Sequence, residues 1–356
     1  MKISQLRSQI DQLDQKILEL LNDRAGLSRC VGQIKNRQGA TIYVPDREWE
    51  VYQRLLRLNR GPLKGEAVKA IYREIMSGAL ALEKSLQIAY LGPAATFTHQ
   101  AALEKFGASV GYVGLDSIST VFSEVEKGRC DYGVVPIENS TEGVVNHTLD
   151  MFIHSDLRIC SEILLEVSHC LMAVCPMKQV RRIYSNPQAI AQCRNWLERH
   201  LSGVELIEVS STTKAAQLAQ MTKKNSKSAA IASQLAAEQY GLKVLAKGIE
   251  DSAENQTRFL VIGKTIAKPT QNDKTSIMCS IQDKVGALYE MLKIFKDNRI
   301  NLTKIESRPS KRKAWEYYFF IDLQGHYETP KVKSALVRVE RKSRFLKILG
   351  SYPAAN

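Results

Sequence analysis

The chain lacks the features that would set it apart from ordinary globular proteins. Only 10 of its 356 residues are proline, while 44% are hydrophobic and 24% are charged, a balance that excludes a collagen-like, low-complexity or disordered chain. No apolar run approaches the roughly 18 residues that span a bilayer, and the opening MKISQLRSQIDQLD lacks the continuous apolar core of a signal peptide. We therefore expect a globular protein of two or three domains.

The seven cysteines contain no CxxC pair and form an odd, scattered set. Such a pattern favours neither a disulfide framework nor a zinc site, and we predict no bound metal. A reduced, cytoplasmic setting fits it better. The positions are Cys30, Cys130, Cys160, Cys170, Cys175, Cys193 and Cys279.

The positive charge is concentrated at the two ends of the chain. Residues 1–86 carry a balance of +5 and residues 271–356 one of +8, whereas residues 87–270 are neutral. A nucleic-acid-binding protein would use the runs 311–313 and 338–347 as phosphate contacts. A solvated loop and a solvated helix face explain both runs more simply, since no aromatic residues are interleaved to stack on bases. We expect neither nucleic acid nor a membrane as a partner.

Residues 3 to about 36 predict one long helix with an apolar seam. Its apolar residues recur at alternating steps of three and four, so the helix needs a partner chain or a bundle to bury them. The seam residues are Ile3, Leu6, Ile10, Leu13, Ile17, Leu20, Leu27, Val31 and Ile34. Arg24 interrupts the seam, and because a charge there is costly unless paired, it suggests a buried anion. An arginine that extends its head to the bundle edge is the alternative.

Helical geometry places Lys35 beside Arg24. Lys35 lies eleven residues, or about three turns, after Arg24 and projects from nearly the same face. Arg7 lies seventeen residues before Arg24 and about 100° away around the axis. Arg7 could therefore hardly serve the same pocket, but it could serve the pocket of a second, antiparallel chain.

Two further helices complete this region. Pro45 and Asp46 predict the start of a helix that runs to about Asn59, because proline suits the first turn and an acid complements the helix dipole. After Gly61-Pro62 a third helix runs to about Ser85. The residues expected to point inward and form a pocket for an anion are Arg24, Lys35, Arg47, Glu48 and Glu83.

Residues 3–86 resemble the all-helical chorismate mutases of the intertwined-dimer type, most specifically in Asp46-Arg47-Glu48 with the upstream Arg24 and Lys35. The resemblance implies that Arg24, Lys35 and the partner's Arg7 bind the two substrate carboxylates and the ether oxygen. Glu48 would bind the ring hydroxyl, with Arg47 in support and Val44 and Ala79 lining the site. The reaction is an intramolecular rearrangement, so the protein supplies a compact conformer and positive charge at the breaking ether bond.

Two positions depart from some members of that family, which carry glutamine at the position of Glu83 and a hydroxyl residue at that of Ala79. A glutamate can donate to the ether oxygen only when it is protonated. We assign Glu83 a catalytic role and expect the mutase activity to fall as the pH rises.

From residue 87 to 270 short β-type runs alternate with helical segments, which predicts an α/β region with mainly parallel strands and room for two lobes. Four strand-to-helix junctions are rich in Gly, Ser, Thr and Asn: 92–98, 138–143, 185–188 and 210–213. Each alone is more simply a helix cap. Four such junctions in one region favour a cleft that binds an anion.

Residues 87–265 resemble prephenate dehydratase, most specifically in Asn255-Gln256-Thr257-Arg258-Phe259 and Pro136-Ile137-Glu138-Asn139-Ser140. The resemblance implies two α/β lobes hinged like a solute-binding protein, with Thr257 acting on the leaving hydroxyl in the cleft. The residues expected to hold the substrate or orient Thr257 are Asn139, Ser140, Thr141, Ser185, Gln192 and Arg258. Asn186 stands where histidine is common in the family, and Ala95 where glycine is common.

The dehydratase chemistry implied by this resemblance needs no cofactor, because aromatisation of the ring drives the loss of carbon dioxide and hydroxide. Hydroxide is a poor leaving group unless it is protonated or hydrogen-bonded as it departs. A positioned donor contributes about 10²–10⁴-fold.

After a linker at 268–272, the chain predicts a β-α-β-β-α-β order typical of ferredoxin-like folds. The predicted elements are strands at 275–281, 300–306, 315–323 and 345–349 and helices at 286–296 and 330–341. Gly286-Ala287-Leu288 and Glu306-Ser307-Arg308-Pro309 resemble the two motifs of ACT domains appended to prephenate dehydratases. The resemblance implies a phenylalanine site at a dimer interface and feedback inhibition. A plain strand-to-helix turn is the alternative.

The sequence therefore predicts a multi-domain α plus α/β protein of the bifunctional chorismate mutase/prephenate dehydratase family, at least a homodimer. The expected domains are a mutase at 1–86, a dehydratase at 87–266 and an ACT domain at 274–356. The alternatives are a regulatory protein that binds an aromatic acid without turnover, an arogenate dehydratase, and a nucleic-acid-binding regulator.

Overall fold

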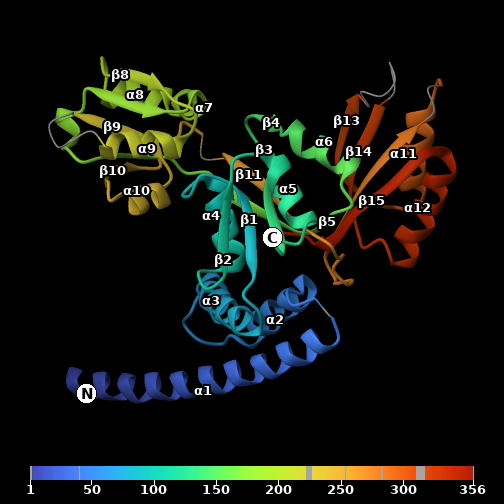
Figure 1. The fold of residues 1–356 in the computed structure, drawn as a ribbon, viewed down its shortest axis with the longest axis horizontal. Coiled ribbons are helices and arrows are strands. Elements are labelled where there is room, and N and C mark those ends of the chain that lie inside the picture. The colour runs from blue at the N-terminus through green and yellow to red at the C-terminus, as the bar shows by residue number, and fades with distance from the viewer. Residues whose placement is uncertain are drawn as a thin grey trace.

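The computed structural model describes residues 2–39, 41–221, 227–252, 254–281, 284–309 and 317–355. The chain forms a helical N-terminal part, two mixed sheets with flanking helices, and a C-terminal four-stranded sheet covered by two helices (Figure 1). The helical part lies below the first sheet, with the second and C-terminal sheets on opposite sides. Within the described ranges, no helix is both long and apolar enough to cross a membrane.

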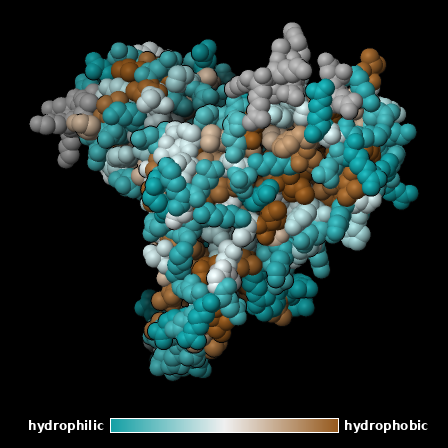
Figure 2. Space-filling model, turned by 45° about the vertical axis from the view of Figure 1, so that its right-hand side comes forward, coloured by the Kyte–Doolittle hydropathy of each residue, from teal (hydrophilic) through white to brown (hydrophobic). Residues whose placement is uncertain are grey.

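The helical part agrees closely with the predicted boundaries. It consists of α1 (Ile3–Arg37), α2 (Pro45–Leu58) and α3 (Gly65–Glu83). The C-terminal half of α1 packs against α3, while its N-terminal half extends past the other two helices (Figure 1). The seam of α1 is consequently exposed, with Ile3 at 71% and Leu20 at 67%. Hydrophobic side chains reach the surface of this part at the bottom of Figure 2.

The first lobe of the central region is a sheet with helices on both faces. Its strand order is β2-β1-β3-β11-β5, with β4 beside β3. The elements are β1 (Gln87–Leu91), α4 (Phe97–Phe106), β2 (Gly111–Leu115), α5 (Ile118–Glu126), β3 (Tyr132–Asn139), β4 (Gly143–Val144), α6 (Asn146–His154), β5 (Arg158–Glu166) and β11 (Gln256–Gly263). Two hydrophobic clusters, one containing Phe122 and Phe152 and the other Phe106 and Phe259, fill the faces of this sheet.

The second lobe has a sheet of order β10-β6-β9-β7-β8. The elements are β6 (Cys170–Ala173), a 3₁₀ turn (Met177–Gln179), β7 (Arg182–Ser185), α7 (Pro187–Gln192), α8 (Arg194–His200), β8 (Glu205–Glu208), α9 (Thr212–Met221), β9 (Ser228–Ala232), α10 (Gln234–Tyr240) and β10 (Lys243–Lys247). Asn186 accepts a hydrogen bond from Ala189 N and so caps α7. Alanines fill much of one side of this core, which lets the helices approach the sheet closely.

The expectation of mainly parallel strands is wrong. The pairs β1–β2, β1–β3, β7–β8 and β7–β9 are parallel, whereas β11 runs antiparallel to β3 and β5, and β6 antiparallel to β9 and β10. The chain leaves the first lobe through β5 and returns to it through β11. The strand on which the chain enters each lobe from the other, β6 in the second lobe and β11 in the first, therefore opposes the βαβ strands of that lobe, whereas β5 runs in the same direction as β3.

The C-terminal part confirms the predicted β-α-β-β-α-β order. It contains β12 (Asp273–Ile281), α11 (Ala287–Asp297), β13 (Leu302–Pro309), β14 (Tyr317–Gln324), α12 (Pro330–Lys342) and β15 (Ser343–Pro353). The antiparallel strand order is β13-β14-β12-β15. One face of the sheet packs beneath α11 and α12, and the other packs on the first lobe through Met278, Phe320 and Tyr352.

Of the two basic runs, only the second lies among the described residues. The run Lys311-Arg312-Lys313 lies outside the described residues. Residues 338–347 are not one solvated helix face, because the helix ends at Lys342 and β15 follows. Lys347 is largely buried and donates hydrogen bonds to the carbonyl oxygens of Phe152 and Ser155.

Arg258 occupies a buried ion cluster between the first lobe and the C-terminal sheet. Its guanidinium lies 2.7 Å from Glu162, 2.8 Å from Glu138 and 2.6 Å from Asp322, and it donates to the Tyr352 hydroxyl at 3.0 Å. Burial opposes ionisation of Arg258, but its acidic neighbours raise the pKa of the guanidinium overall, so it stays charged.

Two lysines complete the same cluster. Lys274 lies 2.8 Å from both oxygens of Glu162, and Lys304 lies 2.5 Å from Glu138. Burial opposes the ionised form of Glu138, yet the hydrogen bonds from Arg258 and Lys304 lower its pKa on balance. The cluster therefore joins the two domains through charges that compensate one another.

Replacing Arg258 with methionine should lower the free energy of unfolding by about 3–5 kcal/mol, because buried carboxylates lose their cation. Urea titration followed by circular dichroism measures this loss. Arg182→Met is the matched control, because Arg182 pairs with Glu205 on the surface and more than half of each side chain is exposed. This substitution should lower the free energy of unfolding by less than about 1 kcal/mol. Equal losses for the two variants would contradict the assignment.

Candidate functional site

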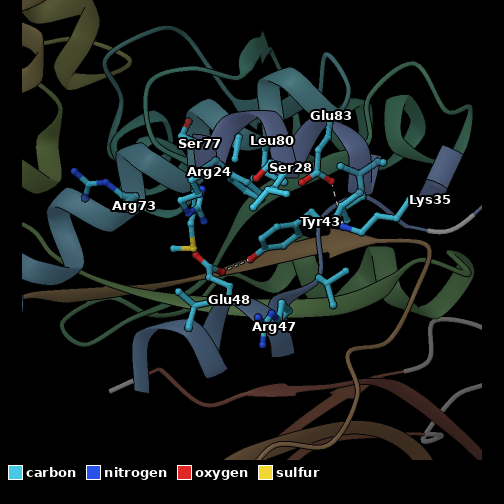
Figure 3. A pocket seen from close by; sticks show the side chains of 18 of the residues that line it. Arg24, Ser28, Lys35, Tyr43, Arg47, Glu48, Arg73, Ser77, Leu80 and Glu83 are labelled. Carbon is cyan, nitrogen blue, oxygen red and sulfur yellow. Dashed lines mark hydrogen bonds and ion pairs between the residues drawn. The ribbon is translucent and has the colours of Figure 1, made fainter. Parts of the chain in front are cut away.

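A cavity of about 350 Å³ lies between α1, α2 and α3 (Figure 3). The predicted residues that line it are Arg24, Lys35, Val44, Arg47, Glu48, Ala79 and Glu83. Further cations at its wall are Arg54, Arg73 and Lys105. Within the described part of the chain, no hydrogen bond or ion pair engages the half-buried guanidinium of Arg24. The cavity is thus rich in positive charge that a dianionic ligand can neutralise.

Lys35 and Glu83 form the buried end of this cavity. Lys35 Nζ lies 3.2 Å from Glu83 Oε2 and donates to the carbonyl oxygen of Ile42 at 2.8 Å. Only 9% of the Glu83 side chain is exposed. Gly32 makes the arrangement possible, since a Cβ there would meet Glu83 at 2.8 Å. The close approach of α1 and α3 at this glycine brings the two side chains together.

Glu48 is held from two sides. The Tyr43 hydroxyl donates to Glu48 Oε2 at 2.8 Å, and Lys105 Nζ lies 2.8 Å from the same oxygen. Burial, followed by the nearby charge of Glu48, raises the pKa of Tyr43 well above its ordinary value, so the phenol remains a donor. Lys105 belongs to α4, the first helix of the central region.

Two other residues predicted for this site, Arg47 and Arg7, do not point into the interior of the cavity. The Arg47 side chain is 60% exposed and pairs with Glu50 at 2.8 Å, so it stands at the rim. Arg7 is exposed on the N-terminal half of α1 and does not line the cavity of its own chain.

A second cluster of polar side chains lies where β3 ends and β11 begins. Asn139 Nδ2 donates to Thr257 Oγ1 at 2.7 Å and to Asn255 Oδ1 at 2.9 Å. Asn139 Oδ1 in turn accepts from both the backbone N and the hydroxyl of Thr141. Because Thr257 Oγ1 accepts from Asn139, its own hydrogen can point to another acceptor. Among the described residues no such acceptor is found.

The cluster continues into the second lobe through Gln192. Gln192 Nε2 donates to Thr141 Oγ1 at 3.1 Å, and its Oε1 accepts from Asn255 Nδ2 at 3.1 Å. His169 Nε2 lies 2.9 Å from the same Oε1. Burial lowers the pKa of His169, although Gln192 partly offsets this effect. Phe97, at the start of α4, packs edge-on against the His169 ring.

Three predicted residues are used elsewhere. Ser185 is fully buried and donates to the Ile231 carbonyl oxygen inside the second lobe. Ser140 donates to the Glu254 carbonyl oxygen, so it braces the loop beside the cluster. Arg258 lies in the ion cluster described above. Neither Ser185 nor Arg258 reaches the polar cluster, and we withdraw both as substrate ligands.

Of the two motifs of the C-terminal part, one starts helix α11 and the other ends strand β13. Gly286 has a positive φ of 80° and precedes α11, a conformation that favours glycine. Ala287 is half-buried, whereas Leu288 is exposed. Along β13, Ser307 and Pro309 are exposed and alternate with Glu306 and Arg308, which are half-buried. Arg308 lies 3.2 Å from Asp150 of α6, so this motif contacts the first lobe.

Sequence reasoning missed Tyr43, Lys105, His169 and Asn255. Asn255 is the first residue of the run that contains Thr257, but it was given no role. His169 and Lys105 carry no local signal, because their importance comes from packing against segments far away in the sequence. Ala95 stands where glycine is common in the family, and its φ of 65° lies in the region that favours glycine.

The chain matches three families in succession. Residues 6–84 match chorismate mutase type II, residues 88–267 match prephenate dehydratase, and residues 275–341 match the ACT domain. Similar curated proteins are bifunctional chorismate mutase/prephenate dehydratases. That of Aquifex aeolicus is 51% identical, covering 99% of this chain and 98% of its own. That of Pseudomonas aeruginosa is 45% identical over the same shares.

Solved structures resemble the central and C-terminal parts. Prephenate dehydratase of Arthrobacter aurescens in complex with L-Phe has a TM-score of 0.69 at 35% identity, covering 75% of this chain and 90% of that one. Prephenate dehydratase of Staphylococcus aureus has a TM-score of 0.66 at 29% identity, over 75% and 100%. GqqA, described as a quorum-quenching acylase, has a TM-score of 0.70 at 27% identity, over 76% and 98%.

Proposed function

The chain belongs to the bifunctional chorismate mutase/prephenate dehydratase family, and we propose that it converts chorismate to prephenate and prephenate to phenylpyruvate under feedback inhibition by phenylalanine. The observation that carries the proposal is the presence of two separate polar sites, each within the segment that matches the corresponding enzyme family. We assign the mutase to residues 1–86, the dehydratase to 87–266 and the effector domain to 274–356. The free cysteines are consistent with a cytoplasmic enzyme.

In the mutase site, the positive charge of the cavity binds the substrate and stabilises its transition state. Arg24 and Lys35 bind the carboxylates and the ether oxygen, which becomes negative as its bond breaks. Glu48 accepts the hydrogen of the ring hydroxyl, and Glu83 donates to the ether oxygen when protonated. Val44, Ala79 and the rim residue Arg47 complete the lining and favour the compact conformer that reacts.

We propose that the mutase acts as a dimer, in which the partner's Arg7 completes each site. Seventeen residues of helix separate Arg7 from Arg24, or about 25 Å, too far to reach the same cavity. The exposed seam of α1 supports this arrangement, since a helix that presents a row of isoleucines and leucines needs a second chain to cover it.

In the dehydratase site, the Thr257 hydroxyl donates a hydrogen bond to the departing hydroxyl of prephenate, and a proton taken up from solvent converts that hydroxyl to water, so Thr257 ends the step unchanged. The carbon–carboxylate bond breaks, its electron pair enters the ring, and the carbon–oxygen bond opposite breaks as carbon dioxide and water leave. Asn139 fixes the orientation of Thr257 by donating to its oxygen. Thr141 and Gln192 hold the substrate, with Ser140 bracing the loop beside them, and because Gln192 comes from the other lobe, the substrate is held from both lobes.

We propose that phenylalanine binds at Gly286-Ala287-Leu288 and Glu306-Ser307-Arg308-Pro309, between two copies of the C-terminal domain. Gly286 lets the backbone approach the ligand, and Leu288 contacts its ring. The exposure of Leu288 and of Ile305, at 37% and 45%, supports a surface that a second chain and the ligand cover together.

A coupled assay of the purified chain tests the two activities. With chorismate, we expect phenylpyruvate to form, and added phenylalanine to suppress it. Thr257→Ala should still produce prephenate but lower phenylpyruvate formation by about 10²-fold or more, because the positioned donor is lost. Thr257→Ser, which keeps the hydroxyl, is the control. Binding of prephenate without any turnover would favour the regulatory alternative, and turnover of arogenate in its place would change the substrate.

Mixing two inactive variants tests the shared mutase site. Arg7→Ala and Arg24→Ala should each lose mutase activity. Co-refolded subunits should recover about a quarter of it, because half of the dimers are mixed and one of their two sites is intact. Chorismate consumption measures the recovery. Absence of recovery, with dimers confirmed by sedimentation, would place Arg7 outside the site.

Glu83→Gln tests the proton donor. The amide donates at any pH, whereas a carboxyl group can donate only when it is protonated. The mutase activity of the unmodified chain should fall as the pH rises from about 5 to 9, and that of Glu83→Gln should stay level. If both profiles are level, Glu83 does not donate to the ether oxygen.

A further inference from the structure

The carboxylate of Glu48 is held by residues from two domains. Tyr43 precedes α2 in the mutase domain, whereas Lys105 stands in the last turn of α4 in the dehydratase domain. Both place a donor 2.8 Å from Glu48 Oε2. Within the described residues, no hydrogen bond reaches the other oxygen, Oε1. The carboxylate therefore has one oxygen fixed and the other free for a ligand in the cavity.

Lys105 is fixed in place by its surroundings. Its side chain is only 20% exposed, and that of Glu48 only 12%. The ammonium group lies 6.0 Å from the centre of the Tyr43 ring. That ring packs against Phe106, the next residue of α4, at 5.0 Å and against Tyr132 of β3 at 5.2 Å. The dehydratase domain thus supports both donors to Glu48.

The charge of Lys105 matters because Glu48 is largely removed from water. A sheltered carboxylate without a cation is unfavourable, and its side chain would turn toward another partner. The cavity offers such partners in Arg24 and Arg54, which also line it. Glu48 paired with either of these would no longer present Oε1 to a hydroxyl group and would neutralise a positive charge that binds a substrate carboxylate, an interaction made alike in the substrate and the transition state.

We propose that Lys105 is a positioning residue of the mutase site: it fixes Glu48 so that Oε1 accepts the ring hydroxyl of the substrate and the cavity arginines remain free. The mutase site is then completed by the dehydratase domain of the same chain. This inference rests on the role proposed above for Glu48.

Steady-state kinetics on full-length variants test the assignment. The ring hydroxyl is bound alike in the substrate and the transition state, so Lys105→Met should raise KM for chorismate about tenfold and leave kcat within about twofold. Lys105→Arg should restore most of the loss. The matched control is Lys84→Met, which removes another ion pair between the same domains, Lys84 with Asp131; Lys84 does not line the cavity, and its loss should change neither constant.

A double variant separates positioning from direct binding. In the Glu48→Gln background, Lys105→Met should change KM by less than about twofold, since its effect passes through Glu48. A full tenfold effect in that background would overturn the proposal, as would unchanged kinetics of Lys105→Met alone. Turnover of prephenate, which uses the other site, reports the integrity of each variant. If Lys105→Met loses that activity, Lys105→Gln replaces it with the same expectations.

These experiments distinguish a failure of the role of Lys105 from a failure of the proposed mutase function. A full-length chain that consumes no chorismate would refute the mutase assignment itself. A chain that consumes chorismate normally with methionine at position 105 would refute only the role of Lys105.

Discussion

The guanidinium of Arg258 is the group on which the arrangement of the dehydratase and C-terminal domains depends. It meets carboxylates from β3, β5 and β14, which belong to two different domains. None of these charges is stable in a buried setting without the others, because desolvation is recovered only when every partner is in place. Such a cluster contributes little net stability but permits one relative placement of the two sheets, and nearby apolar contacts then stabilise it.

The need to pair sheltered charged and polar groups also explains why the two candidate sites lie where domains or lobes meet. The mutase cavity receives Lys105 from the dehydratase domain, and the polar cluster at Thr257 receives Gln192 from the second lobe. Each contact joins a charged or polar group to a partner on another unit. Polar groups that are partly sheltered must be satisfied, so the units are held together at the points where ligands bind.

Periodic sequence patterns allowed many of the helices and strands to be predicted from the sequence. The seam of α1, the proline that starts α2 and the order of elements in the C-terminal domain are local signals, and their boundaries agree with the structure within a few residues. Strand direction was not predictable in the same way, because it depends on where the chain crosses between lobes. The uses of Ser185 and Lys105 were also out of reach, since each is decided by a partner more than forty residues away.

The alternation of side chains along a strand accounts for the neighbouring Thr257 and Arg258. Successive residues of β11 point to opposite faces, so the threonine reaches the polar cluster while the arginine reaches the C-terminal domain. The paired strand β3 repeats the arrangement, with Asn139 on the threonine side and Glu138 on the arginine side. Lys304, two residues before the Glu306–Pro309 motif, holds Glu138. This ion pair therefore links β13 to the two strands that align Asn139 with Thr257.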